Sequence, residues 1–169
     1  MNDKIVNLKD LFFQQLRVIL KGEQQQLSTL KTMDKNATSM ELKEVLQRHI
    51  NETEQQLHRM ENIFLKLDQD PEGEESSVMQ CLIGEFQQLI NRSVDEEVRD
   101  AAIITAIQHI NHYEIACYGT ALAHARGMDF DEVSRLLHQS LVEEKKADID
   151  LTQLAFGGIN EKAMMPVFR

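Results

Sequence analysis

The sequence has little of what β-sheets and long irregular loops require. Its 169 residues include no tryptophan, two prolines and seven glycines, and only 5% of them are aromatic. Alternation of β-branched residues is hard to find, whereas Glu, Gln, Leu, Lys and Ala, which are good helix formers, dominate. These absences argue against a sheet-based fold and predict a single all-α domain, long enough to bury a core.

Further absences limit the compartment and the partners. Cys81 and Cys117 are isolated and show no metal or redox spacing, which favours free thiols in a reducing compartment. No apolar run is long enough to span a bilayer, and Lys4, Lys9 and Asp10 interrupt any start that resembles a signal peptide. A formal charge of -10 argues against nucleic-acid binding. We expect a cytoplasmic protein that binds neither nucleic acids nor membranes.

Apolar residues at three- and four-residue spacing predict four long helices, at about 5–34, 39–68, 95–126 and 130–156. Capping boxes that start at Thr38 and Ser93 open the second and third of them, and Gly127 gives the third a left-handed stop. A short fifth helix is expected at 76–91, inside the connection between the second and third long helices. The bundle would occupy 1–158, with a C-terminal tail at 159–169.

The lengths of the connections predict the topology. Two connections have only a few residues, so each must join an antiparallel helical hairpin. The middle connection has about 25 residues and can cross the whole bundle, which would leave the second and third long helices parallel. A single long crossover is the ferritin-like form of the four-helix bundle.

Each long helix carries a carboxylate inside its apolar stripe: Glu23, Glu52, Glu114 and Glu144. At about 1.5 Å per residue, the two acids of each hairpin stand roughly 20 Å from their turn and therefore face each other. One such glutamate usually reaches solvent, but four in one interior layer would repel each other and lose hydration. Protons or cations must then neutralise them. Oxygen-rich ligation suits iron or manganese, so we predict a two-metal centre.

The nitrogen ligands depart from the common pattern. Di-iron bundles use Glu-x-x-His on two helices, whereas the corresponding triplets here are Glu52-x-x-Gln55 and Glu144-x-x-Ala147. Gln56 and Asp148, one residue further along, are expected on the interior face and could complete the site through oxygen. His49 lies one turn before Glu52 and could be a ligand. The interpretation we favour is that it holds a carboxylate by hydrogen bonding.

Five motifs occur in the chain: Leu8-Lys9-Asp10-Leu11-Phe12, Glu23-Gln24-Gln25, His49-x-x-Glu52-Thr53-x-x-Gln56, His112-Tyr113-Glu114-Ile115-Ala116-x-Tyr118 and Glu143-Glu144-Lys145-x-x-Asp148. In order and separation they resemble the bacterial YciF/YciE stress-protein family, over about residues 7–155. The resemblance implies a ferritin-like bundle, often dimeric, with a di-metal site and a role in stress response. The biochemical activity of that family is not well defined.

Carried over by position, the resemblance implies metal ligands at Glu23, Glu52, Gln56, Glu114, Glu144 and Asp148, with His49, Asn111 and Tyr118 beside them. Two positions depart from the family's pattern. Asn111 stands where the family usually has Glu, and Leu20 stands where it often has Tyr. An amide oxygen still binds hard cations, but it does not offset their charge.

Two functions remain open at this point. The first is a metal-dependent redox protein that handles iron, peroxide or oxygen, with a small-molecule oxidant as its partner. The second is a non-catalytic homodimeric bundle that acts through protein contacts and keeps a degenerate metal site. Asn111 and the absent Glu-x-x-His triplets favour the second function, and the four-acid layer favours the first.

Overall fold

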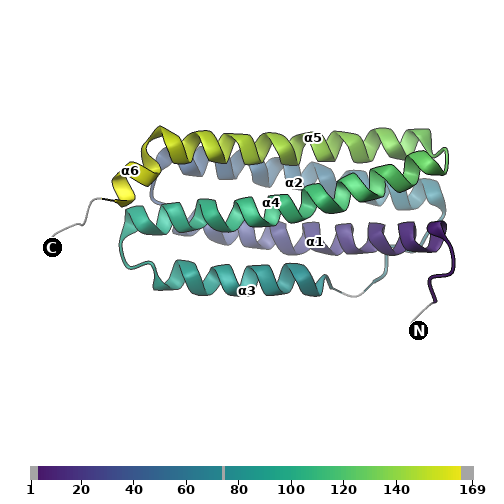
Figure 1. Cartoon of the computed structure of the whole chain (residues 1–169), viewed down its shortest axis with the longest axis horizontal. Helices are drawn as coiled ribbons and strands as arrows, with labels where there is room; N and C mark the ends of the chain where they lie inside the picture. Colours follow the sequence, from purple (N-terminus) through teal and green to yellow (C-terminus); the bar gives the residue numbers. More distant parts are fainter. Residues whose placement is uncertain (1–3, 74, 165–169) are drawn as a thin grey trace.

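The computed structural model describes residues 4–73 and 75–164. The regular elements among these residues are all helices. The elements are α1 (Leu8–Asn36), α2 (Met40–Leu67), α3 (Ser77–Arg92), α4 (Glu96–Gly127), α5 (Asp131–Leu154), a π-helical turn η1 (Ala155–Ile159) and α6 (Asn160–Ala163). Helices α1, α2, α4 and α5 form the bundle, and α3 lies along its outside, next to α1 and α4 (Figure 1). Within the described part of the chain, no helix is both long and apolar enough to cross a bilayer.

The connection between α2 and α4 crosses the full length of the bundle. It leaves the C-terminal end of α2, carries α3 back along the outside, and enters α4 at the opposite end, so that α2 and α4 run parallel (Figure 1). The α1–α2 and α4–α5 connections are tight turns between antiparallel neighbours. The chain is therefore a ferritin-like four-helix bundle with one long crossover that contains a short helix, as the connection lengths predict.

The apolar core of the bundle is divided in two. One cluster, near the start of α1, includes Phe12, Leu16, Met60, Phe64, Tyr118 and Leu137. The other, near the start of α2, includes Leu30, Met33, Leu42, Leu46, Ile103 and Leu151. Buried polar side chains, among them Glu23, Gln56 and Glu114, occupy the middle of the bundle. This polar layer is the unusual feature of the core.

Helix boundaries lie within three residues of the predicted ones at most of the long helices, but the capping residues differ. Ser39, rather than Thr38, accepts the hydrogen bond that caps α2. At α4 the cap is Asp95, which accepts from the backbone N–H groups of the first turn, and the predicted box at Ser93 is wrong. Asp95 is preferred because its carboxylate carries a negative charge next to the positive end of the helix dipole.

The two predicted glycine stops also differ from the structure. The left-handed residue after α4 is Asp129, with φ of 58°, instead of Gly127. Helical structure continues past the predicted end of the last long helix, because the chain kinks at Gly158, with φ of 135°, and resumes as α6. Ile159, placed in the expected tail, is buried in the core. The bundle therefore includes α6, and 165–169 lie outside the described residues.

Asp100, near the start of α4, binds the turn that connects α1 to α2. Its carboxylate is 3% exposed and accepts hydrogen bonds from Thr38 N (2.8 Å), Thr38 Oγ1 (2.8 Å) and Ser39 N (2.7 Å). The Asp100 carboxylate thus accepts from two backbone N–H groups of the α1–α2 turn that lie ahead of the intrahelical hydrogen bonds of α2. This contact fixes the height of α4 relative to the first hairpin.

Replacing Asp100 by alanine should lower the free energy of unfolding by about 2–4 kcal/mol, since it removes three hydrogen bonds to a charged group. Urea unfolding followed by circular dichroism measures the change. Glu96→Ala, an exposed change at the same end of the bundle, is the control and should lie within about 0.5 kcal/mol of the unmodified protein. An Asp100→Ala protein as stable as that control would contradict the proposed role of this contact.

Candidate metal centre

Three carboxylates converge at the middle of the bundle. Glu23 of α1, Glu114 of α4 and Glu144 of α5 are 0%, 4% and 0% exposed. One oxygen from each lies within 4.8 Å of the oxygens from the other two. Oxygens that bind one hard cation at about 2.0–2.6 Å stand at most about 5 Å apart, so the spacing suits a single shared ion.

The hydrogen bonds to these carboxylates leave several oxygens unpaired. Tyr118 donates its hydroxyl to Glu23 Oε1 (2.5 Å), and Gln56 Nε2 donates to Glu144 Oε1 (2.9 Å). Glu23 Oε2, Glu144 Oε2 and both oxygens of Glu114 have no hydrogen-bond partner among the described residues. Buried carboxylate oxygens without donors are costly, and they are also the ligands that hard cations prefer. The donor set therefore fits a hard cation.

Burial strongly perturbs these acids. Removal from water raises the pKa of Glu23 well above its ordinary value, and the nearby Glu144 raises it further, while the Tyr118 hydrogen bond opposes the change. Burial likewise raises the pKa of Glu114, followed by repulsion from Glu23 and Glu144. Without a cation, protons are the alternative means of neutralising this cluster.

Helix α2 contributes no carboxylate to this group of three, whereas four acids were expected in the interior layer. The inward face of α2 carries His49, Thr53 and Gln56, all at most 2% exposed. Glu52 precedes Thr53 by one residue, or about 100° around the helix, and lies half-buried on the flank. Burial raises its pKa, His49 lowers it, and the neighbouring Glu143 and Glu144 raise it. A ligand role for Glu52 stays a prediction.

Of the other predicted site residues, some lie at the carboxylate cluster and one lies outside it. Gln56 reaches the centre, where it bridges Glu144 and Glu143 (3.2 Å) through one amide nitrogen. His49 Nε2 lies 3.6 Å from Glu144 Oε2. Asp148 is partly exposed and lies beside Gln108 and His112 instead, which leaves it outside the cluster.

Sequence reasoning missed Gln26, which links two of the expected neighbours of the centre. Its side chain is fully buried, and Nε2 lies 3.3 Å from His49 Nε2 and 3.4 Å from Asn111 Oδ1. Gln26 follows Glu23 by three residues and so shares its helix face. That spacing was the available signal, but the Gln-rich stretch around it gives no reason to single out one glutamine.

The crossover helix α3 covers the centre between α1 and α4. A methyl group added at Gly22 would lie 3.6 Å from Met79 Cε and 4.0 Å from Glu114 Oε1, so the fully buried Met79 packs close to the acids. Ser76, the cap of α3, is anchored by Gln25 on one side and by the Tyr113 hydroxyl (3.1 Å) on the other. These contacts hold the start of α3 against α1 and α4.

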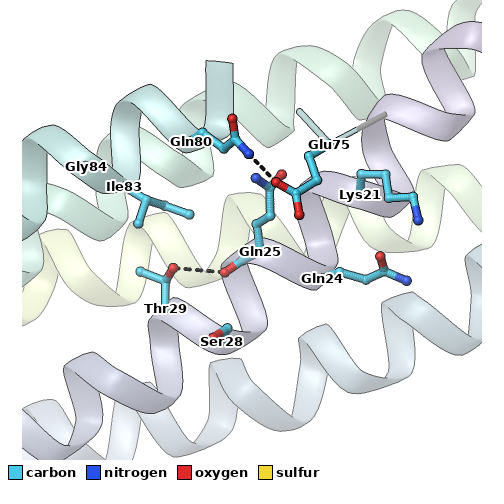
Figure 2. A pocket seen from close by; sticks show the side chains of 9 residues that line it. All are labelled: Lys21, Gln24, Gln25, Ser28, Thr29, Glu75, Gln80, Ile83 and Gly84. Atoms are coloured by element: carbon cyan, nitrogen blue, oxygen red, sulfur yellow. Dashed lines mark hydrogen bonds between the residues drawn. The ribbon is translucent and has the colours of Figure 1, made fainter. Parts of the chain in front are cut away.

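A groove of about 520 Å³ lies outside the carboxylate cluster, between α1 and α3. Figure 2 shows Lys21, Gln24 and Gln25 of α1 on one wall and Gln80 and Ile83 of α3 on the other. Its lining is polar and open, and none of the three clustered acids contributes to it. The groove and the candidate metal centre are therefore separate features.

Fold and site together define a ferritin-like bundle with a buried carboxylate centre. The chain belongs to the family described as a domain of unknown function (DUF892), whose model matches residues 7–164. It is 33% identical over 161 residues to protein YciF of Escherichia coli K12, covering 92% of this chain and 95% of that protein. The family resemblance seen in the motifs is thereby confirmed.

Two solved structures share the fold. The crystal structure of the E. coli stress protein YciF matches with a TM-score of 0.88 at 30% identity, covering 92% of this chain and 99% of that one. YcfI of Rhodopseudomonas palustris matches with a TM-score of 0.87 at 36% identity, covering 90% and 97%. The chain is thus a member of the YciF-like stress-protein family over nearly its whole length.

The raised pKa of Glu114 predicts how the metal-free protein responds to pH. A group whose folded pKa lies above its ordinary value of 4.5 adds stability below that pH, and the contribution is lost as pH climbs through the folded pKa. Relative to Glu114→Gln, the unmodified metal-free protein should therefore lose stability as pH rises above 4.5.

Urea unfolding in the presence of a chelator, at a series of pH values, measures this difference. Glu85→Gln, an exposed change on α3, is the control and should keep a constant offset from the unmodified protein. A pH-independent difference between the unmodified protein and Glu114→Gln would mean that Glu114 does not hold a proton in the folded state.

Proposed function

We propose that this chain is a cytoplasmic stress-response protein that binds iron or manganese at its buried carboxylates and handles iron, peroxide or oxygen there. The observation that carries the proposal is the convergence of Glu23, Glu114 and Glu144, with four of their oxygens unpaired. Three buried acids whose charges repel one another would destabilise the fold unless a proton or a cation compensates. A cation is the ligand that their geometry suits.

Bound iron or manganese supplies a centre that exchanges electrons with peroxide or oxygen. The chain's own residues hold and shield that centre. Tyr118 and Gln56 hold one oxygen each of Glu23 and Glu144, and the second oxygen of each has no hydrogen-bond partner among the described residues. Met79 keeps water away on the α3 side. Arg59 neutralises Glu143 (2.7 Å), so the acid beside Glu144 adds no unpaired charge.

Replacing Glu114 or Glu144 by alanine should lower the affinity for Mn²⁺ or Fe²⁺ by about a hundredfold or more, equivalent to about 2.7 kcal/mol. Isothermal titration of protein first stripped with a chelator measures the affinity. Glu44→Ala, an exposed change on α2, is the control. Glu52→Ala tests whether Glu52 is also a ligand. A loss of metal affinity as large as that of Glu114→Ala would identify Glu52 as a fourth ligand.

Redox function is tested by following peroxide consumption and Fe²⁺ oxidation under stopped flow. The iron-loaded protein should accelerate both reactions relative to free Fe²⁺, and Glu114→Ala should not. Tight metal binding without acceleration would remove the redox proposal and would favour the second candidate.

The second candidate is a homodimer that acts through protein contacts. Val142, Ile149 and Phe156 are 51%, 51% and 85% exposed and are seven residues apart. Residues at this spacing share one side of a helix and commonly form its seam with another helix. An apolar line of this kind on α5 and η1 supports a surface that a second copy covers.

Sedimentation velocity tests this candidate. The unmodified protein should sediment as a dimer, and Ile149→Glu should shift it toward the monomer because a charge would be buried at the seam. Val94→Glu, at a position 91% exposed in the connection between α3 and α4, should leave the dimer intact. A monomeric unmodified protein would exclude this candidate.

A further inference from the structure

The buried polar side chains next to the three acids include two uncharged amides, Gln26 and Asn111, and Gln26 lies within hydrogen-bond distance of both Asn111 and His49. Gln26 and Asn111 each lie three residues from an acid, Glu23 on α1 and Glu114 on α4. Because α1 and α4 are antiparallel, both lie on the same side of the acids along the bundle axis (Figure 1). His49 of α2 completes this neighbouring group, and all three side chains are at most 2% exposed.

The Gln26 amide nitrogen lies close to the two atoms of that group that are best suited to bind a cation. It is 3.3 Å from His49 Nε2 and 3.4 Å from Asn111 Oδ1. An amide NH₂ presents partial positive charge, and here it meets the imidazole nitrogen and the carbonyl oxygen that a second cation would require. The position next to the three acids is thus filled by a fixed, uncharged donor.

The charge and the number of available ligands are also too small for two cations. Two divalent cations would bring four positive charges against three carboxylates, and Gln26 and Asn111 supply no negative charge. Paired cations about 3.5–4 Å apart also share bridging carboxylates and need further ligands at each ion. With α2 contributing an amide through Gln56 instead of an acid, the described residues offer one strong set of oxygens.

We infer that the centre holds a single cation, bound by Glu23, Glu114 and Glu144, and that the Gln26 amide takes the place of a second cation. This inference rests on the proposed metal-binding function and specifies it. A single bound ion would be held by one carboxylate from each of α1, α4 and α5, without the second metal that paired-metal sites use.

Gln26→Glu provides the matched test, because it keeps the size of the side chain while removing the amide donor and adding a fourth acid. The probe is Mn²⁺, measured by equilibrium dialysis with metal analysis and by electron paramagnetic resonance, which separates isolated from coupled ions. We expect one isolated Mn²⁺ per chain for the unmodified protein and two coupled ions for Gln26→Glu. Gln24→Glu, an exposed change on the same helix, should keep one.

Two further variants serve as controls. One replaces Gln26→Glu if that variant does not fold, and the other tests whether Glu52 contributes to metal binding. Asn111→Glu adds an acid to the same position from α4, so it should also bind two ions if Gln26→Glu fails to fold. Glu52→Ala should still bind one ion, because Glu52 lies outside the cluster.

The stoichiometry separates failure of this inference from failure of the proposed function. Two coupled ions in the unmodified protein, or a single ion in both folded acid variants, would overturn the single-cation inference alone. Absence of bound Mn²⁺ and Fe²⁺ from the unmodified protein would overturn the proposed function and this inference together.

Discussion

The structure depends on the cost of keeping three carboxylates away from water in the middle of an apolar bundle. Moving one unpaired charge into such an interior costs several kcal/mol, which is comparable to the whole stability of a domain of this size. Glu23, Glu114 and Glu144 come from three helices, so their repulsion acts directly on the packing of the bundle. Hydrogen bonds from Tyr118 and Gln56 offset part of that cost, and the rest must come from protons or a cation.

The crossover allows the three acids to meet. Because α2 and α4 run parallel, α1 lies antiparallel to α4, and Glu23 and Glu114 reach the same height from opposite ends of the bundle (Figure 1). The bonds of Asp100 to the α1–α2 turn fix that height, since a shift of one turn would move Glu114 by about 5.4 Å. The helix α3 then closes the exposed side with Met79. Fold, register and cover are thus set by contacts far from the acids themselves.

The sequence was sufficient for the topology and for the three clustered acids, because connection length and position on a stripe are local properties. It was insufficient for α2. His49, Glu52 and Gln56 all lie near one stripe, and the packing of Leu46, Met60 and Ile63 decides how the helix is rotated about its axis. That rotation buries Thr53 and leaves Glu52 on the flank. Packing of this kind involves residues from other helices, which a single-helix pattern cannot show.

The caps and the C-terminal end failed for a related reason. Thr38 and Ser39 are both good capping residues, and Asp100, 61 residues further along, decides between them by binding Thr38 and the Ser39 backbone. Gly158 has the left-handed conformation expected of a helix stop, yet Ile159 finds space in the core and the helix resumes. In each case a distant contact overrides a local signal.

Proton binding and the proposed cation binding would be coupled at this centre. Burial and Glu144 raise the pKa of Glu23, and burial, Glu23 and Glu144 raise the pKa of Glu114, so a cation would have to displace protons that an exposed carboxylate would already have lost. Affinity for a cation bound there would therefore rise with pH over the range in which these acids titrate, and acidification would release it. Two donors oppose the effect of burial, because the Tyr118 hydroxyl lowers the pKa of Glu23 and the Gln26 amide lowers the pKa of Glu114. Both ionised acids therefore depend on neighbouring donors as well as on any bound cation.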